Sequence, residues 1–321
     1  MESAGSRRAA LVGSYMLTLA CLQGAAAGAA PSVAGILVKG AWSSSSDALT
    51  AVPERGTWTG HTYSNAYFDL AFSLSRDWTQ RYDGPPPSDS GYYVLAQLEP
   101  AGSSQVSRGH LLIAAQDMFF TSVPARNALE YINYYKDHLD ADYKIEQPPT
   151  AVRFAGHDFV RFDYASPVAK LHWRVLATEI RCHIVQFVFT SSSTRQIDGL
   201  IENMTPTKPP ADGLAPGNGD GATPVCIKVF ANAETVTERA QPVFSEPRFN
   251  AVPVRIVIDS QGRVRHIHFL SAFPEQTKSI SDALLQWRFK PYVVNGRTLE
   301  VETGMFFGHE PRSGVSALRP P

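Results

Sequence analysis

Four side chains in one stretch of the chain carry groups that could do acid–base chemistry: His157, Asp163, His172 and His183. Imidazole and carboxylate groups exchange protons near neutral pH, so a cluster of them could serve a hydrolase-like enzyme as general acid and base. They fall on successive strand-like segments, and neighbouring strands pair, so some of them could meet. The other interpretation is that all four are hydrogen-bonded residues of a sheet, and this is the one we adopt.

A second pattern, His266 and His268, is typical of paired metal ligands, because residues two apart on a strand point to one face about 6 to 7 Å from each other. No third ligand stands nearby in sequence, and polar residues on an outward strand face are commoner than a metal site, so we favour that interpretation of the pair. The chain also lacks a nucleophile elbow, a zinc-protease helix, a phosphate-binding glycine loop and a Cys-x-x-Cys motif. We therefore predict a protein that is not an enzyme and has no metal or cofactor.

The composition is that of a globular, secreted protein. With 321 residues and 44% apolar residues, the chain has room for two domains. Its formal charge of -1 leaves no excess of basic residues to bind a phosphate backbone, so we expect no nucleic-acid partner. Arg7 and Arg8 precede an uncharged run that ends in small residues, which indicates a signal peptide over residues 1–27. We expect a periplasmic or secreted location, with membrane attachment only if this segment is uncleaved.

The elements that carry the histidines belong to a predicted α+β domain at residues 57–204, after a flexible tether at 28–56. Alternating apolar residues predict strands near 68–74, 91–99 and 109–117, and four more at 150–155, 158–165, 169–180 and 182–190. A helix is expected after Ser122, with Ala128, Leu129, Ile132, Tyr135 and Leu139 on its buried stripe. Ser193 begins a second helix.

Residues 205–224 are rich in proline and glycine and predict a linker. Its reach of at most ~65 Å would let two domains move independently. The second domain, 225–309, has a strand PVCIKVFA, a hairpin over 254–271, a helix near 275–286, a strand at 287–294, an Asn295-Gly296 turn and a last strand, LEVETGMFF. A disordered tail (310–321) follows. Cys182 and Cys226 could pair in an oxidising compartment, or Cys182 could be a small buried residue.

Four blocks of the second domain resemble the C-terminal domain of TonB-type energy transducers: VRIVIDSQGRV (254–264), DALLQWRFKP (282–291), VNGR (294–297) and VET (301–303). The resemblance implies a sheet with an edge strand that pairs with an extended segment of an envelope protein or peptide, including an outer-membrane receptor. The residues expected to bind such a partner are those of the last strand: Leu299, Glu300, Val301, Glu302, Thr303 and Met305.

A true transducer has an uncleaved membrane anchor, often with a histidine in it, and a long proline-rich rod. Residues 9–30 contain no histidine, the linker is short, and a whole domain stands where the rod would be. We therefore favour a binding protein of the cell envelope over a membrane-anchored transducer for outer-membrane transport. The first domain is similar to PsbP-like sandwiches in its element order and in its aromatic opening strand followed by Trp78.

Overall fold

The computed structural model describes residues 45–46, 56–74, 78–80, 90–100, 109–154, 156–207, 224–244 and 251–308. We call residues 56–207 the first lobe and residues 224–308, with the short strand 45–46, the second lobe. The predicted signal peptide, most of the tether and the linker, and the C-terminal tail lie outside the described residues. Strands dominate the described part, which contains three helices, so the fold is α+β or mainly β.

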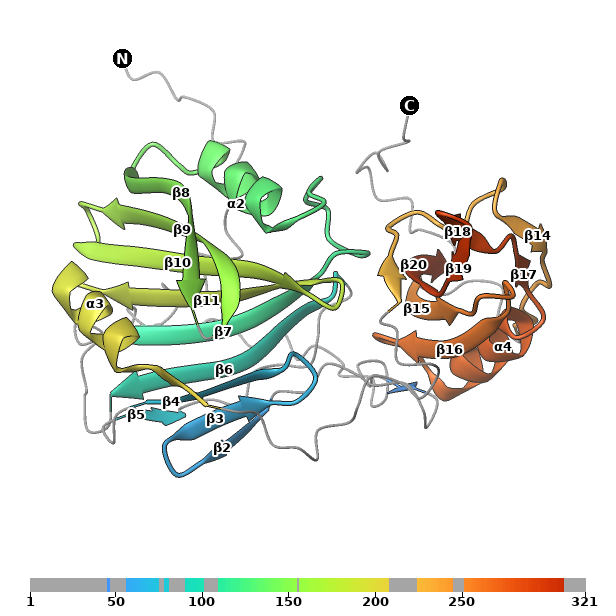
Figure 1. The fold of residues 1–321 in the computed structure, drawn as a ribbon, viewed down its shortest axis with the longest axis horizontal. Helices are drawn as coiled ribbons and strands as arrows, with labels where there is room; N and C mark the ends of the chain where they lie inside the picture. Colours follow the sequence, from blue (N-terminus) through green and yellow to red (C-terminus); the bar gives the residue numbers. More distant parts are fainter. Residues whose placement is uncertain are drawn as a thin grey trace, which may run out of the picture.

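The first lobe is built on a seven-stranded antiparallel sheet (Figure 1). The strands, in spatial order, are β5 (Trp78–Gln80), β6 (Tyr92–Pro100), β7 (His110–Asp117), β11 (His183–Ser191), β10 (Leu171–Ile180), β9 (His157–Ser166) and β8 (Lys144–Phe154). The predicted strands at 91–99, 109–117, 158–165, 169–180 and 182–190 are confirmed. All residues of β11 are buried, as expected of a central strand.

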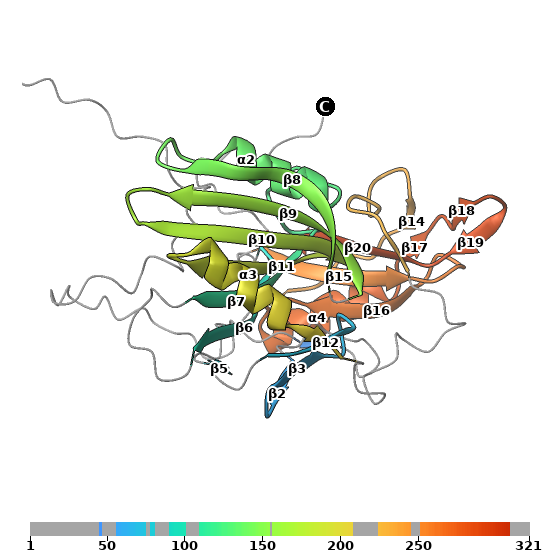
Figure 2. The same ribbon diagram turned by 60° about the vertical axis from the view of Figure 1, so that its left-hand side comes forward.

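Two different layers cover the two faces of this sheet (Figures 1 and 2). Helix α2 (Ala128–Asp137) packs on one face through Tyr131 and Ile132. Helix α3 (Thr194–Asn203) and a four-stranded sheet cover the other face. That smaller sheet contains β12 (Thr205–Pro206), β4 (Leu70–Ser73), β3 (Thr62–Asn65) and β2 (Thr57–Thr59) in this order.

The start of α2 differs from the prediction. Ser122 lies in a bend and Pro124 in irregular structure, and the helix begins after Asn127, whose Oδ1 accepts the Glu130 N–H at 2.9 Å. Of the residues predicted for its buried stripe, Ala128 and Ile132 are buried but Leu129 is 48% exposed, and Tyr131, which was not assigned to the stripe, is fully buried. Helix α3 begins after Ser193, as predicted.

Strand β8 begins six residues earlier than the prediction of 150, and it includes Pro148 and Pro149. Prolines cannot donate a main-chain hydrogen bond, and strands tolerate them at sheet edges and irregularities. Both conditions hold here, because β8 is an edge strand and its register with β9 shifts between Gln147 and Thr150.

The second lobe is built on a five-stranded sheet. Its strands, in spatial order, are β1 (Ser45–Ser46), β16 (Val264–Phe269), β15 (Val252–Ile258), β20 (Val301–Phe307) and β13 (Val225–Cys226). Helix α4 (Pro274–Leu284) and Trp287 cover one face, where they form a core with Ile256 and Val301. Two residues of the expected tether thus pair with β16.

The remaining strands of the second lobe form two short pairs. β14 (Val236–Glu238) pairs with β17 (Arg288–Phe289), and β18 (Tyr292–Val294) pairs with β19 (Arg297–Leu299). The two strands predicted for 287–294 and for LEVETGMFF are therefore each divided into two. The turn between β18 and β19 is as predicted, since Asn295 and Gly296 have φ of 51° and 77°.

Candidate functional site

A buried ionic network joins the two lobes. Asp117 ends β7, His183 begins β11, and strand register places them opposite each other. Arg255, in the middle of β15, contacts both: its Nη1 lies 2.9 Å from His183 Nε2 and 3.3 Å from Asp117 Oδ2. Its Nη2 donates to Glu302 of β20 at 2.5 Å. The network fixes the second sheet against the end of the first one.

The protonation states of this network follow from its burial. Burial, and next the charge of Arg255, lowers the pKa of His183 well below its usual value, so its imidazole is neutral. Its Nε2 then accepts from Arg255, and its Nδ1–H donates to the main-chain oxygen of Arg181 at 2.6 Å. Burial raises the pKa of Asp117 to about 6, although Arg255 opposes this shift. Arg255 is thus the fixed cation around which the other groups are arranged.

An aromatic wall seals the network from solvent on the first-lobe side. The rings of Tyr67, Phe68 and Tyr93 lie 5.8, 5.3 and 5.7 Å from the His183 ring in edge contacts. His183 and Asp117 are both 0% exposed, and Arg255 is 3% exposed. No substrate can reach such a network in this conformation, so its position favours a role in holding the lobes together.

Aromatic contacts between the two lobes also border the network. The rings of Phe120 and Phe306 meet edge to face at 5.3 Å, and the Arg255 guanidinium lies 5.4 Å from the Phe119 ring centre. Gly304 of β20 lies against Phe119 so closely that a Cβ atom there would be 2.4 Å from Phe119 Cβ. Glycine is therefore required at this position for the observed approach of the lobes.

A disulfide between Cys182 and Cys226 adds a covalent link to this junction. Of the two interpretations of Cys182, pairing is the one that the structure confirms. Cys182 and Arg181 form the two-residue turn between β10 and β11, with φ of 61° and 48°. Such a turn favours asparagine and glycine, so two bulkier residues here are strained. Together with the ionic network, this bond contradicts the expectation that the two domains move independently.

Strand β20, predicted as the free edge strand, is not at the edge of its sheet over its first residues. β13 pairs with it in parallel at Val301 and Glu302, and the disulfide at Cys226 holds β13 in place. The Val225 N–H donates to Glu300 O at 2.8 Å, and the Ile227 N–H donates to Glu302 O at 3.0 Å. The prediction of an open edge fails here because a segment distant in sequence from β20 covers it.

The six residues predicted to bind a partner have different surroundings. Val301 and Thr303 are buried, and Glu302 belongs to the ionic network. Glu300 pairs with Arg265 at 2.6 Å, and Leu299 lies in β19 opposite Tyr292. Met305, the last of the six, lines a cavity.

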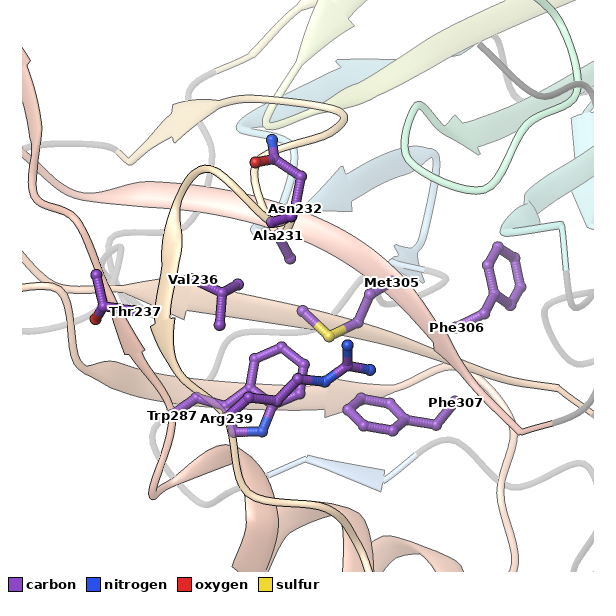
Figure 3. A pocket seen from close by; sticks show the side chains of 10 residues that line it. Ala231, Asn232, Val236, Thr237, Arg239, Trp287, Met305, Phe306 and Phe307 are labelled. Atoms are coloured by element: carbon purple, nitrogen blue, oxygen red, sulfur yellow. The ribbon is translucent and has the colours of Figure 1, made fainter.

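That cavity has a volume of about 290 Å³ and lies beside the second half of β20. Figure 3 shows Arg239 over Trp287, with Met305 and Phe307 beside them. The Arg239 guanidinium is 5.0 Å from the Trp287 ring centre, and Trp287 Nε1–H donates to Ala240 O. The cavity therefore offers an apolar floor with one exposed positive charge at its mouth.

The histidines and the aspartate considered for catalysis are not brought together. Asp163 binds Arg161 and Arg174, and His172 contacts Glu146 at 2.9 Å. His172 pairs with Ser191 at one end of β11, whereas His183 is at the other end, so they are roughly 26 Å apart at 3.3 Å per residue. His157 Nε2 lies 3.4 Å from Asp69 O.

His266 and His268 lie on the face of β16 that turns toward the first lobe. Both are buried, so the expectation of an outward, solvent-facing pair is wrong. His268 is opposite Arg255 on β15, which places a fixed positive charge beside it. Within the described residues, no group of three or more histidine, cysteine or acidic side chains is placed to hold a metal ion.

Sequence reasoning missed Asp117, Arg255 and Glu302 as members of one network. The available signal was Arg255 itself, a charged residue inside the apolar run of β15, all of whose residues are buried. A buried charge requires a partner, but the sequence alone does not say which acid supplies it.

No protein-family model matches the chain, and no curated protein matches it in sequence. Among solved structures, it is similar to the solution structure of cyanobacterial PsbP (CyanoP) from Synechocystis sp. PCC 6803. The identity is 13% and the TM-score is 0.30, over 47% of this chain and 96% of that one. In the part of the chain that the structure describes, none of the helices has the length and apolar character needed to cross a membrane.

Proposed function

We propose that the protein is a periplasmic or secreted binding protein of the cell envelope, and that its second lobe binds an extended segment of a partner protein. The observation that carries this proposal is the cavity beside the second half of β20, next to the part of the strand that β13 does not cover. The resemblance of the four sequence blocks to TonB-type C-terminal domains supports the same mode of binding.

The main-chain N–H and C=O groups of β20 point in the direction that the addition of a strand requires. Glu300 and Glu302 accept from β13, so alternate residues of this strand turn their main-chain groups away from β15. Gly304 and Phe306 continue this alternation. Strand β15 is consistent with this direction. Pro253 is the partner of Phe306 in the register, but its carbonyl oxygen accepts from the Leu270 N–H and not from Phe306. We call the main-chain groups of Gly304 and Phe306 the outer rim.

The cavity determines the chemistry of the segment that we expect. The apolar lining of Trp287, Met305 and Phe307 would accept one apolar side chain of the bound segment. The neighbouring side chains of that segment would point to the other face, because side chains alternate along a strand. Arg239, exposed at the mouth, would attract an acidic group next to that apolar residue. The partner is therefore an extended segment with an apolar residue and an adjacent acid.

The test is a selection of short random peptides on the full chain, followed by affinity measurements by fluorescence polarisation. We expect selected peptides to carry the apolar and acidic pair. Phe306→Pro removes the outward N–H and should weaken binding about tenfold, equivalent to about 1.4 kcal/mol. Phe306→Ala keeps that N–H and should have a smaller effect.

Matched variants separate the cavity from general surface effects. Ala233 lines the cavity and is exposed, so Ala233→Trp should fill the cavity and abolish binding. Leu129→Trp adds a ring at an exposed position of α2 in the first lobe and should leave binding unchanged. Peptides that bind Ala233→Trp and Phe306→Pro as well as the native chain would refute the proposed function.

A further inference from the structure

We propose that Cys182–Cys226 is a thiol–disulfide exchange site, at which a dithiol reductant releases β13 from β20. The bond closes the junction of the lobes and also fixes the strand that covers the first part of the outer side of β20. Its reduction would change the surface available on β20 without requiring any other covalent bond to break.

The two sulfur atoms differ in access. Cys182 is 1% exposed, at the buried end of the β10–β11 turn, whereas Cys226 is exposed. A thiolate can attack only a sulfur that it can approach in line with the disulfide bond. Cys226 Sγ is therefore the atom that an external thiolate attacks, and Cys182 is the leaving group.

The dithiol reductant supplies all the electrons and protons that the exchange requires. A thiolate of the dithiol forms a bond to Cys226 Sγ, the Cys182–Cys226 bond breaks, and its electron pair goes to Cys182 Sγ, which takes up a proton. The second thiol of the reductant then attacks the mixed disulfide and releases the Cys226 thiol. Two electrons and two protons pass to the protein, and the dithiol becomes a disulfide.

The released Cys182 thiol has a hydrogen-bond acceptor in place. Its Sγ lies 3.3 Å from Glu302 Oε2, and a disulfide sulfur has no proton to donate to that carboxylate. The thiol formed by reduction has one. The reduced side chain thus keeps a polar partner inside the junction, and Glu302 retains its bond to Arg255.

β13 depends on the disulfide more than the rest of the junction does. The strand has two residues, and main-chain bonds from Val225 and Ile227 attach it to β20. Such a short pairing is marginal without a further constraint. The contacts of Arg255 with Asp117 and His183 do not involve the disulfide, so the lobes should stay docked while β13 leaves.

Hydrogen exchange on the full chain tests the release. After dithiothreitol treatment, the amides of Val225 and Ile227 should exchange at least tenfold faster. The amides of Phe289 and Lys290, which donate to Gly262 and Thr235 in the same lobe, should keep their rates. Cys226→Ser should show the fast exchange without any reductant.

Trapping with a single-thiol probe, glutathione, tests the attack. Mass spectrometry should find the mixed disulfide on Cys226. A disulfide that dithiothreitol reduces only in denaturant, a mixed disulfide on Cys182, or unchanged Val225 and Ile227 exchange after reduction would each overturn the proposal.

One consequence rests on the proposed function: reduction would add the main chain of Glu300 and Glu302 to the outer rim, so selected peptides should bind the reduced chain more tightly. Release of β13 without any peptide binding would refute the proposed function and leave the exchange site intact. Peptide binding that reduction does not alter, with β13 still protected, would refute the exchange site alone.

Discussion

Arg255 Nη1 donates to His183 Nε2 across 2.9 Å, and these two residues belong to different sheets in different lobes. The same guanidinium contacts Asp117 and Glu302, so one cation serves three polar partners at the junction.

Replacement of Arg255 by leucine should destabilise the protein strongly. The change leaves Asp117 and Glu302 without their cation in a buried site, and breaking a buried ion pair typically costs about 3–5 kcal/mol. Urea unfolding of both chains measures the difference. Arg153→Leu is the matched control, because Arg153 and Asp158 are exposed and such pairs contribute about 1 kcal/mol or less. Equal losses in the two variants would contradict the importance of the network.

His183→Gln should change the pH dependence of stability on the acidic side. Burial lowers the pKa of His183 in the folded chain, so below about pH 6.5 the unfolded chain binds more protons at this residue. The stability that neutral His183 contributes is present above that pH and is lost as the pH falls. Glutamine does not titrate, so the advantage of the native chain should shrink from about pH 8 to about pH 5. The difference is measured by urea unfolding. If it stayed constant across this range, the pKa of His183 would be the same in the folded and unfolded chains.

Asp117→Asn should have the opposite pH dependence. Burial raises the pKa of Asp117 to about 6 from an ordinary value of 3.8, so the folded chain binds more protons between these values. Its contribution is present below the ordinary value and is lost as the pH rises through about 6. The stability of the native chain relative to Asp117→Asn should therefore decline from about pH 4 to about pH 6. A rising difference would show that Arg255 outweighs burial at this carboxyl group.

Gly304→Ala should weaken the contact between the lobes. The added Cβ would lie 2.4 Å from Phe119 Cβ and 3.0 Å from Phe120 Cζ, and neither lobe can yield without moving main chain. Overpacking of this kind costs about 1–3 kcal/mol. Gly199→Ala, in α3 with open space around it, should instead stabilise by about 0.5–1 kcal/mol. Both are measured by urea unfolding, and loss of stability in Gly199→Ala alone would be inconsistent with this view of the junction.

Local patterns predicted the elements that depend on local chemistry. Alternating apolar residues gave most strands of the large sheet, Ser193 gave the start of α3, and Asn295-Gly296 gave the β18–β19 turn. Trp287, which lies in the block DALLQWRFKP, is buried in the core of the second lobe. These features require only a few consecutive residues, so one sequence contains the necessary information.

Features that depend on distant segments were not predictable in the same way. The run PVCIKVFA has the composition of a long strand, yet only Val225 and Cys226 pair with β20. Lys228 leaves the strand direction and donates to the main-chain oxygen of Thr121 in the first lobe at 3.3 Å. Packing between the lobes decides whether a sheet edge is covered and which acid contacts Arg255. The periodicity of apolar residues along the sequence contains no information about such packing.

The two prolines of β8 have a consequence for how the protein behaves at high concentration. β8 ends the seven-stranded sheet, and an unprotected outer strand would invite the same strand of a neighbouring molecule to join it. Neither Pro148 nor Pro149 has an N–H to offer an added strand, and the register shift between Gln147 and Thr150 breaks the regular ladder at that edge. The β8 edge of the large sheet is thereby protected from the strand-by-strand pairing between molecules that builds polymers.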